Sequence, residues 1–273
     1  MLRRAKLGLN TGKRGGASAD AGFVLPDTGN LARVYSLRQY DGYSGFCIRV
    51  VRATDSATLD VGFVDGVVDA TAIASFCAGT TGKVDRWYDQ SGTGTFAFQA
   101  TDGRRPFIYE SGAIVTYGGV TSLRWPAASD LGIGSTIDCQ SSFAVYKITS
   151  IQGLNTILFG SSTAQMWAGG TAIGGVNGVT IWTGSVRVTN TSENTNYNLS
   201  SWFGGSDDKV DTNASDEATA GSEIGAFNIS NISRGDGNFS INGYMHEVIL
   251  YTASQYANKS TIENMINDYY SIY

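Results

Sequence analysis

Cysteine, proline and histidine are all scarce in this chain of 273 residues, which has three cysteines, three prolines and one histidine. A single histidine excludes any site built from several imidazoles. The cysteines, Cys47, Cys77 and Cys139, are odd in number and widely spaced, which matches neither a zinc pattern nor a disulfide framework. We expect three buried thiols, with one disulfide among them as the alternative.

Charge is also scarce, and no apolar run is long enough to span a bilayer. Charged residues make up 16% of the chain, and the net charge is −5. A nucleic-acid-binding protein usually carries a basic face, so this composition predicts neither nucleic-acid binding nor membrane insertion. The first six residues lack the apolar core of a signal peptide.

Glycine and aromatic residues are abundant, with 35 glycines and 11% aromatics. Short apolar runs alternate with Gly, Ser, Thr and Asn clusters, a pattern typical of an all-β sandwich or barrel. The strongest strands are expected at 46–52, 142–148, 155–160 and 243–251. Helices are expected at 69–76, capped by Asp69, and at 260–270, where Ser260 and Glu263 have capping-box spacing.

The N-terminal residues differ from the rest of the chain. Residues 1–30 are expected to form an extended arm, and residues 31–273 one folded domain. The arm is basic at its start, with five cations before the first acid, namely Arg3, Arg4, Lys6, Lys13 and Arg14. It is interpreted either as a solvated segment or as a segment that docks on an acidic neighbouring subunit.

The centre of the chain is a predicted strand, turn and strand between Phe76 and Gln99. Strand alternation places Val84, Arg86 and Tyr88 on one face, with Asp85 and Trp87 on the other. A turn follows, because Asp and Ser side chains bond to nearby backbone and Gly tolerates positive φ. The motif reads Trp87, Tyr88, Asp89, Gln90, Ser91 and Gly92.

This motif resembles the catalytic domain of arabinofuranosidase B-type glycoside hydrolases. The segments 74–81, 35–38 and 45–50 are similar to the same family. The resemblance implies a concanavalin A/laminin G-like jelly-roll β-sandwich, here with a C-terminal helix and an extended N-terminal arm. It also implies a glutamate nucleophile, but the corresponding segment, 157–163, contains no acid, and Thr163 lies near the nucleophile position. Gly82 replaces the family's second cysteine near Cys77. The expectation is therefore a protein that is not an enzyme.

The C-terminal segments 243–251 and 262–273 are similar to the ends of sandwich domains in tailed-bacteriophage virion proteins. Together the two resemblances predict a non-catalytic virion structural protein, either a head decoration or fibre or a tail component, assembled in the host cytoplasm. Its expected partners are other virion proteins, further copies of itself and a surface glycan, with the basic arm as the attachment segment. The alternatives are an active glycoside hydrolase and a free carbohydrate-binding module.

Several polar residues are candidates for catalysis. A retaining glycosidase needs two carboxylates about 5–5.5 Å apart, and no spacing pairs the candidates Asp89, Glu110, Asp138 and Glu247. His246 and Glu247 are neighbours on a strand and therefore face opposite sides of the sheet. Structural roles are favoured for both Asp89 and His246.

The sequence also contains candidates for two kinds of binding site. No cofactor is expected, apart from calcium held by the oxygens of Asp207, Asp208 and Asp211, with a solvated acidic loop as the favoured alternative. Exposed aromatic rings can stack on sugars, and three tryptophans lie near polar loops. The glycan-binding candidates are Trp167, Trp182 and Trp202, with core positions as the alternative.

Overall fold

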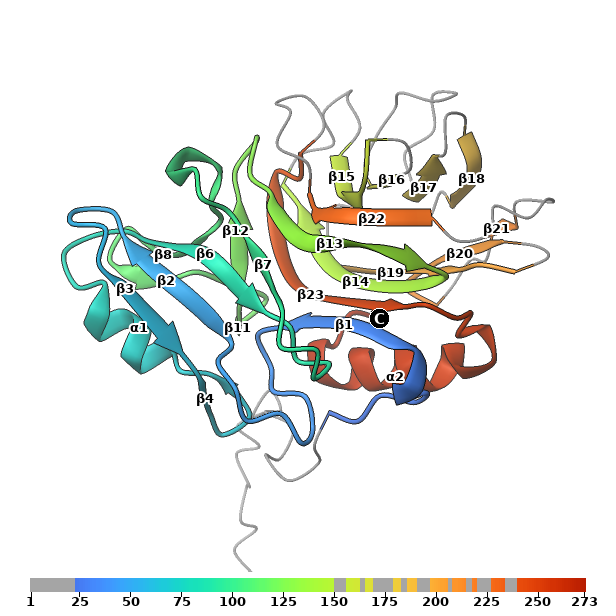
Figure 1. Ribbon diagram of the computed structural model, residues 1–273, viewed down its shortest axis with the longest axis horizontal. Coiled ribbons are helices and arrows are strands. Elements are labelled where there is room, and N and C mark those ends of the chain that lie inside the picture. Colours follow the sequence, from blue (N-terminus) through green and yellow to red (C-terminus); the bar gives the residue numbers. More distant parts are fainter. Residues whose placement is uncertain are drawn as a thin grey trace, which may run out of the picture.

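The computed structural model describes residues 23–149, 156–162, 165–168, 179–182, 186–190, 197–205, 208–214, 218–219, 227–233 and 240–273. Among these residues, hydrogen bonds join 19 strands into one continuous sheet, and two further ribbons have two strands each. The fold is all-β, as the sequence predicted, and Figure 1 shows the strands in curved layers with helix α2 against one side. In the described part of the chain, no helix is long and apolar enough to cross a membrane.

The first layer is built around the long C-terminal strand β23. Strands β1 and β14 pair with β23, and β14 continues through β19 to β20 and β21. The bounds are β1 Leu31–Ser36, β12 Leu123–Trp125, β14 Ser141–Ile148, β19 Asn198–Phe203, β20 Lys209–Thr212, β21 Ala218–Thr219 and β23 Gly243–Tyr251.

The second layer packs against the first, with Phe227 of one against Trp202 of the other. Its order runs from β7 through β13, β22, β15, β16 and β17 to β18. The bounds are β7 Phe96–Phe98, β13 Leu131–Cys139, β15 Thr156–Gly160, β16 Gln165–Ala168, β17 Val179–Trp182, β18 Val186–Asn190 and β22 Phe227–Ile232.

The N-terminal strands extend the second layer, because β6 pairs with β7 on one side and with β2 on the other. The bounds are β2 Ile48–Arg52, β3 Thr58–Val61, β4 Phe63–Val64, β5 Val67–Val68, β6 Gly82–Tyr88, β8 Phe107–Glu110, β9 Ala113–Ile114, β10 Thr116–Tyr117 and β11 Val120–Thr121. The helices are α1 Ala70–Phe76 and α2 Lys259–Tyr270, and the 3₁₀ turns are η1 Thr28–Asn30, η2 Asp102–Arg104 and η3 Tyr256–Asn258.

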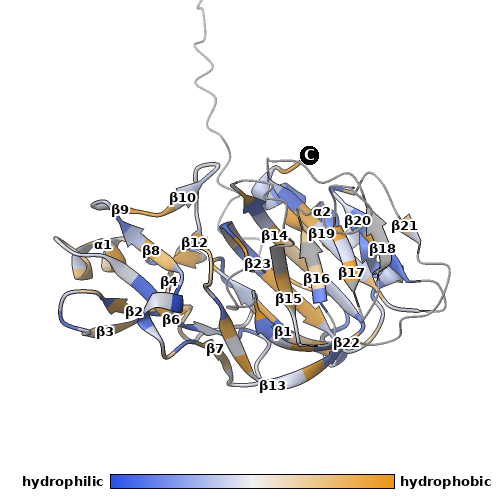
Figure 2. Cartoon of the chain, turned by 90° about the horizontal axis from the view of Figure 1, so that it is seen from above, coloured by the Kyte–Doolittle hydropathy of each residue, from blue (hydrophilic) through white to orange (hydrophobic). Residues whose placement is uncertain are grey.

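The main core lies between the layers. Trp202 of β19 is fully buried, and its ring centroid lies 4.5 Å from that of Phe227 on β22. A second cluster fills the space between α2 and the first layer, and it includes Phe143, Ile262 and Ile266. Figure 2 shows apolar and polar colours alternating along the strands, as expected where each strand has a buried face.

The folded part extends into the segment expected to be an arm. Phe23 and Leu25 are buried in the cluster under α2, and Tyr251 donates to the Pro26 carbonyl. The five basic residues of the arm lie outside the described residues. The three cysteines are free and buried, in agreement with the favoured interpretation.

The central motif holds the open edge of β1. One edge of β1 pairs with β23, and the turn after β6 supplies side chains to the other. The Val34 amide donates to Asp89 Oδ1 at 2.8 Å, and Gln90 Nε2 donates to the Ser36 carbonyl at 2.8 Å. Gln90 Oε1 accepts from the Tyr40 amide at 2.7 Å. The turn thus satisfies backbone groups that a neighbouring strand would otherwise pair.

The predicted alternation along β6 is wrong at Asp85. The register against β2 shifts between Arg49 and Val50, where β6 has one extra residue. This bulge places Val84 and Trp87 in the same core, both 0% exposed. Asp85 instead pairs with Arg49, because a bulge re-aims the side chain at its position.

The two predicted helices are present, but only one cap is as expected. Asp69 accepts a hydrogen bond from the Ala72 amide at 2.9 Å, so it caps α1. Helix α2 begins at Lys259 with Asn258 at the N-cap, and no side chain makes the cap hydrogen bond. The predicted capping box of Ser260 and Glu263 is therefore wrong, because η3 starts the helical path before Ser260.

His246 is a structural residue. It is fully buried, and its Nδ1 lies 3.2 Å from the Thr121 carbonyl, which makes Nδ1 the donor and leaves Nε2 as an acceptor. Nε2 lies 2.5 Å from the Tyr197 hydroxyl. Burial lowers the pKa of His246 to about 3. The ring is therefore neutral at the pH values at which a histidine usually exchanges protons.

This shift predicts a specific dependence of stability on pH. The unfolded chain binds a proton on His246 near pH 6.5, whereas the folded chain binds it near pH 3. The contribution of this group is therefore present above about pH 6.5 and is lost as the pH falls toward 3, by up to about 1.4 kcal/mol per pH unit. We expect the His246→Gln variant to lack this slope in urea titrations between pH 7 and 4. Equal slopes in both proteins would contradict the burial of a neutral ring.

Candidate functional site

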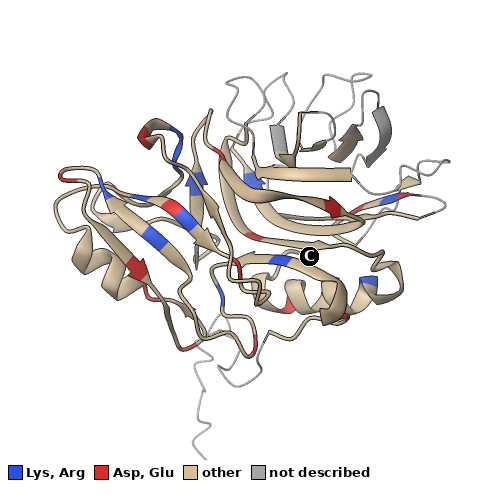
Figure 3. Ribbon diagram, viewed as in Figure 1, with Lys and Arg blue, Asp and Glu red and all other residues tan. Residues whose placement is uncertain are grey.

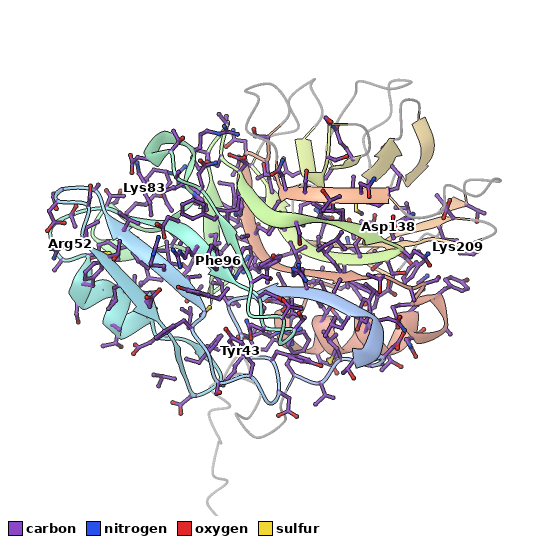
Figure 4. The ribbon with its side chains drawn as sticks, in the orientation of Figure 1. Tyr43, Arg52, Lys83, Phe96, Asp138 and Lys209 are labelled. Atoms are coloured by element: carbon purple, nitrogen blue, oxygen red, sulfur yellow. The ribbon has the colours of Figure 1, made fainter. Side chains whose placement is uncertain are left out.

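Four aromatic side chains form a continuous strip on the outer side of β6 and β7. The ring centroids of Phe46 and Tyr88 are 6.0 Å apart, those of Tyr88 and Phe96 5.9 Å, and those of Phe96 and Phe98 6.2 Å. Phe46 is 50% exposed and Phe98 38% exposed. We call this strip, with Arg86, the aromatic face; Phe96 is labelled in Figure 4.

Charged groups are spread over the aromatic face in balanced numbers. The Arg86 guanidinium lies over the Phe96 ring, 4.2 Å from its centroid. Arg49 makes a two-pronged ion pair with Asp85, and the Tyr88 hydroxyl donates to Asp60 Oδ1 at 2.6 Å. These two cations and two anions balance one another. Figure 3 shows both signs on β2, β3 and β6.

The aromatic face continues across the neighbouring strands. Strand register places Arg49 opposite Arg86, Arg86 opposite Phe98, and Phe98 opposite Gly132. Gly132 in turn faces Asn231 of β22. Directly paired residues present their side chains on one face of a sheet. A Cβ on Gly132 would lie 3.4 Å from Asn231 Oδ1, so the Asn231 side chain packs closely over this glycine.

The described carboxylates proposed for catalysis have structural partners. Glu247 is fully buried and accepts from Arg38, Ser36 and Tyr270. Asp89 accepts from five donors in and around its turn. Glu110 pairs with Arg124, and Asp138 is exposed on β13. The structure therefore does not bring any two of these four carboxylates together as a glycosidase pair.

A second group of buried acids lies beside α2. Asp211 makes an ion pair with Lys259, and both its side chain and that of Glu263 are almost fully buried. Lys259 and Glu263 help to line a polar hollow of about 510 Å³. The sequence does not predict Glu263 as a site residue, because its spacing from Ser260 indicates a capping role instead.

The predicted calcium site is not assembled by the described residues. Asp208 accepts from the Gly205 amide at 3.1 Å, and Asp211 is paired with Lys259. Asp207 lies outside the described residues. Within the part of the chain that the structure describes, no group of three or more His, Cys, Asp or Glu residues is placed to hold a metal ion.

Of the three tryptophans predicted to bind a glycan, the structure describes the side chain of Trp202. Trp202 is a core residue, 0% exposed, so the expectation that it stacks on a sugar is corrected in favour of the alternative. Trp167 lies on β16 and Trp182 on β17, but their side chains are outside the described residues. Thr163 is also outside them. The sequence did not predict the aromatic face, because its residues come from three separate segments of the chain.

Part of the chain matches a known protein family. Residues 30–120, a third of the chain, match the family described as alpha-L-arabinofuranosidase B, catalytic. Probable alpha-L-arabinofuranosidase B of Aspergillus fumigatus is 44% identical over 66 residues, which are 23% of this chain and 13% of that protein. Alpha-L-arabinofuranosidase B of Penicillium canescens is 42% identical over 66 residues, 23% of this chain and 14% of that protein. The aligned stretch thus covers about one seventh of the length of each relative.

Solved structures resemble the chain over a longer stretch. A GH54 arabinofuranosidase soaked with a cyclic sulfate inhibitor superposes with a TM-score of 0.67 at 16% identity, over 88% of this chain and 63% of that one. An arabinofuranosidase complexed with arabinofuranosyl-alpha-1,2-xylobiose gives 0.65 at 17% identity, over 88% and 62%. At these identities the likeness shows the fold, a β-sheet-rich sandwich.

These comparisons correct the functional prediction made from the sequence. The matched proteins are arabinofuranosidases, including fungal ones, and none is a virion component. The predictions of a virion structural protein, of a location in the virion and of a protein that is not an enzyme are therefore wrong. The lack of an acid in segment 157–163 does not exclude catalysis, because one segment does not define a catalytic pair.

Gly82, which stands where the family resemblance implies a second cysteine, lies beside Cys77. A Cβ built on Gly82 would be 2.5 Å from the Cys77 sulfur. The backbone therefore keeps the closeness that a short disulfide requires, although Gly82 carries no thiol.

Proposed function

We propose that this chain is a glycoside hydrolase that acts on α-L-arabinofuranosides. The observation that carries the proposal is the family match over residues 30–120, which includes the motif that holds the edge of β1. The sandwich shared with solved arabinofuranosidases over 88% of the chain supports it. The proposal includes a jelly-roll connectivity for this sandwich.

The proposed chemistry uses two carboxylic groups. In a retaining enzyme, one carboxylate attacks the anomeric carbon as the glycosidic bond breaks, while the other group protonates the leaving oxygen. The second group then takes a proton from water, which releases the sugar from the first. This reaction uses no cofactor, so the sequence prediction that none is bound remains part of the proposal.

Structural partners narrow the search for the catalytic pair. Glu247 and Asp89 are fully engaged in buried hydrogen bonds, and Asp85 and Glu110 are ion-paired with arginines. Two described acids lie beside helix α2: Glu263 lines a hollow, and Asp211 makes an ion pair with Lys259, which lines the same hollow. Six further acids between residues 150 and 240 lie outside the described residues: Glu193, Asp207, Asp216, Glu217, Glu223 and Asp236.

The test is an amide scan of these eight acids. Each is changed to Asn or Gln, and hydrolysis of 4-nitrophenyl α-L-arabinofuranoside is measured with melting temperature as a check on folding. We expect two variants to lose about 100-fold to 10,000-fold in kcat with an unchanged melting temperature. Added azide should restore glycosyl transfer to the variant that lacks the nucleophile's partner acid.

Asp138→Asn is the matched control, because Asp138 is exposed and makes no ion pair with the described residues. It should keep full activity. Equal activity in all eight variants would contradict a catalytic pair among them. An inactive but folded wild-type protein would contradict the proposed function itself.

A further inference from the structure

An amine and two carboxyl groups gather where helix α2 begins. Lys259 is the first residue of α2, and its Nζ contacts Asp211 Oδ2 on β20. Glu263 follows Lys259 by one helical turn, so the two lie on the same face of α2, and both line the hollow beside it. Burial, and then the charges of Glu263 and Asp211, raise the pKa of the Tyr273 hydroxyl to about 12, whereas Lys259 lowers it. All three side chains therefore lie within electrostatic range of a single group.

The contact between Lys259 and Asp211 is largely shielded from water. The Asp211 side chain is 2% exposed and the Lys259 side chain 19%. Asp211 Oδ1 is buried and has no hydrogen-bond partner among the described residues. A carboxylate with an unsatisfied oxygen is unfavourable in a buried position. An amide carries no charge, so joining the two side chains would remove both charges from the site.

A second lysine–aspartate contact shows what is different about the first. Lys83 contacts Asp102, but the Asp102 side chain is 60% exposed. Water stabilises both charges of an exposed pair, and an ammonium group has no lone pair with which to attack. Burial favours the neutral pair of amine and carboxylic acid instead. The pair beside α2 is therefore the one that is placed to react.

We propose that Lys259 and Asp211 become joined by an isopeptide bond, with Glu263 as the group that transfers the proton. The Lys259 ammonium first gives a proton to the Asp211 carboxylate that it contacts, which leaves an amine beside a carboxylic acid. Nζ then attacks Cγ, and a C–N bond forms. Glu263 takes a proton from Nζ and passes it to the hydroxyl group on Cγ, so that the C–O bond breaks and water leaves. The products are one amide and one water molecule, and the balance requires no oxidant or other reactant.

The bond would tie β20 to the start of α2. Strands β21, β22 and β23 lie between residues 211 and 259, so the bond closes a large loop of the chain. Closing such a loop restricts the unfolded chain more than the folded one. We expect Lys259→Arg, which keeps the positive charge opposite Asp211, to melt about 10 °C below wild type. The inference does not depend on the proposed function, but it would remove Asp211 from the candidates for the catalytic pair.

The test is mass spectrometry of the full chain after unfolding in urea. The wild-type mass should be lower than that of the sequence by one water molecule, whereas Lys259→Arg and Asp211→Ala should show no such loss. Trypsin then locates the bond, because it does not cut after a lysine whose amine is acylated. The linked product joins peptide 210–234 to an uncut peptide 235–273. Without the bond, the digest gives peptides 210–234, 235–259 and 260–273.

Two controls accompany this digest. Lys83 and Asp102 are the internal control, since trypsin should cut after Lys83 and no product should link these two residues. Glu263→Gln keeps the size of the side chain but cannot transfer the proton. We expect this variant to fold and to form the bond about 100-fold more slowly than wild type. Formation at the wild-type rate would overturn the role of Glu263.

The wild-type digest decides the inference as a whole. A linked product that contains Lys259 and Asp211 supports it. A folded wild-type protein, shown by its cooperative melt, that yields peptides 235–259 and 260–273 and no linked product overturns it, and the contact is then only an ion pair. Neither result alters the test of the proposed function, which is measured by hydrolysis of the arabinofuranoside.

Discussion

Glu247→Gln is expected to destabilise the folded protein by about 3–5 kcal/mol, because it leaves the Arg38 guanidinium buried without a counter-charge. Arg38 donates to both carboxylate oxygens, at 2.7 and 2.8 Å. Burial alone would lower the pKa of Arg38, but the adjacent Glu247 raises it above its ordinary value, so the arginine stays charged. Urea denaturation at pH 7 measures the loss.

A double variant separates the charge from the shape of this pair. Replacing Arg38 by Met and Glu247 by Leu removes both charges together, and such replacements are often neutral. We expect the double variant to recover much of the stability that Glu247→Gln loses. If Glu247→Gln kept its stability and instead lost activity, Glu247 would be a catalytic residue and its structural assignment would be wrong.

Asp89→Ala is expected to cost about 3 kcal/mol or more. The carboxylate accepts from the Val34 amide, from the Ser91 amide and hydroxyl, and from Thr93 and Thr95. Alanine leaves the buried Val34 amide without its acceptor, and one such loss alone costs about 1–3 kcal/mol. The change in urea midpoint, with unchanged m-value, measures the effect.

Asparagine at the same position provides the graded comparison. Asp89→Asn keeps one acceptor oxygen for the Val34 amide but cannot accept from the hydroxyl groups through its NH₂. It should fall between wild type and Asp89→Ala, and Asp138→Asn on the exposed side of β13 should not differ from wild type. An Asp89→Ala variant as stable as wild type would show that the turn does not hold β1.

Local signals explain what the sequence predicted correctly. The turn at Asp89–Gly92 and the cap of α1 by Asp69 each depend on residues close together in the chain. The helix at the C-terminus follows from its apolar stripe, which includes Ile262 and Ile266. Short-range hydrogen bonding and periodicity are sufficient to find such features.

Long-range pairing explains what the sequence did not predict. Arg38 and Glu247 are 209 residues apart, and nothing local to either one indicates the other. The bulge at Asp85 exists only because β6 pairs with β2, so its effect on side-chain direction appears only in the sheet. The aromatic face likewise depends on the register of Phe98 against Arg86 and Gly132.

The most direct test of the proposed function is to incubate the wild-type protein with arabinofuranosyl-α-1,2-xylobiose at pH 6–7 and to identify the products by proton NMR. Our account predicts release of L-arabinose and xylobiose at a rate that is lost in two of the eight amide variants. A folded protein, shown by its cooperative melt, that leaves the trisaccharide intact over hours at high enzyme concentration would contradict the account.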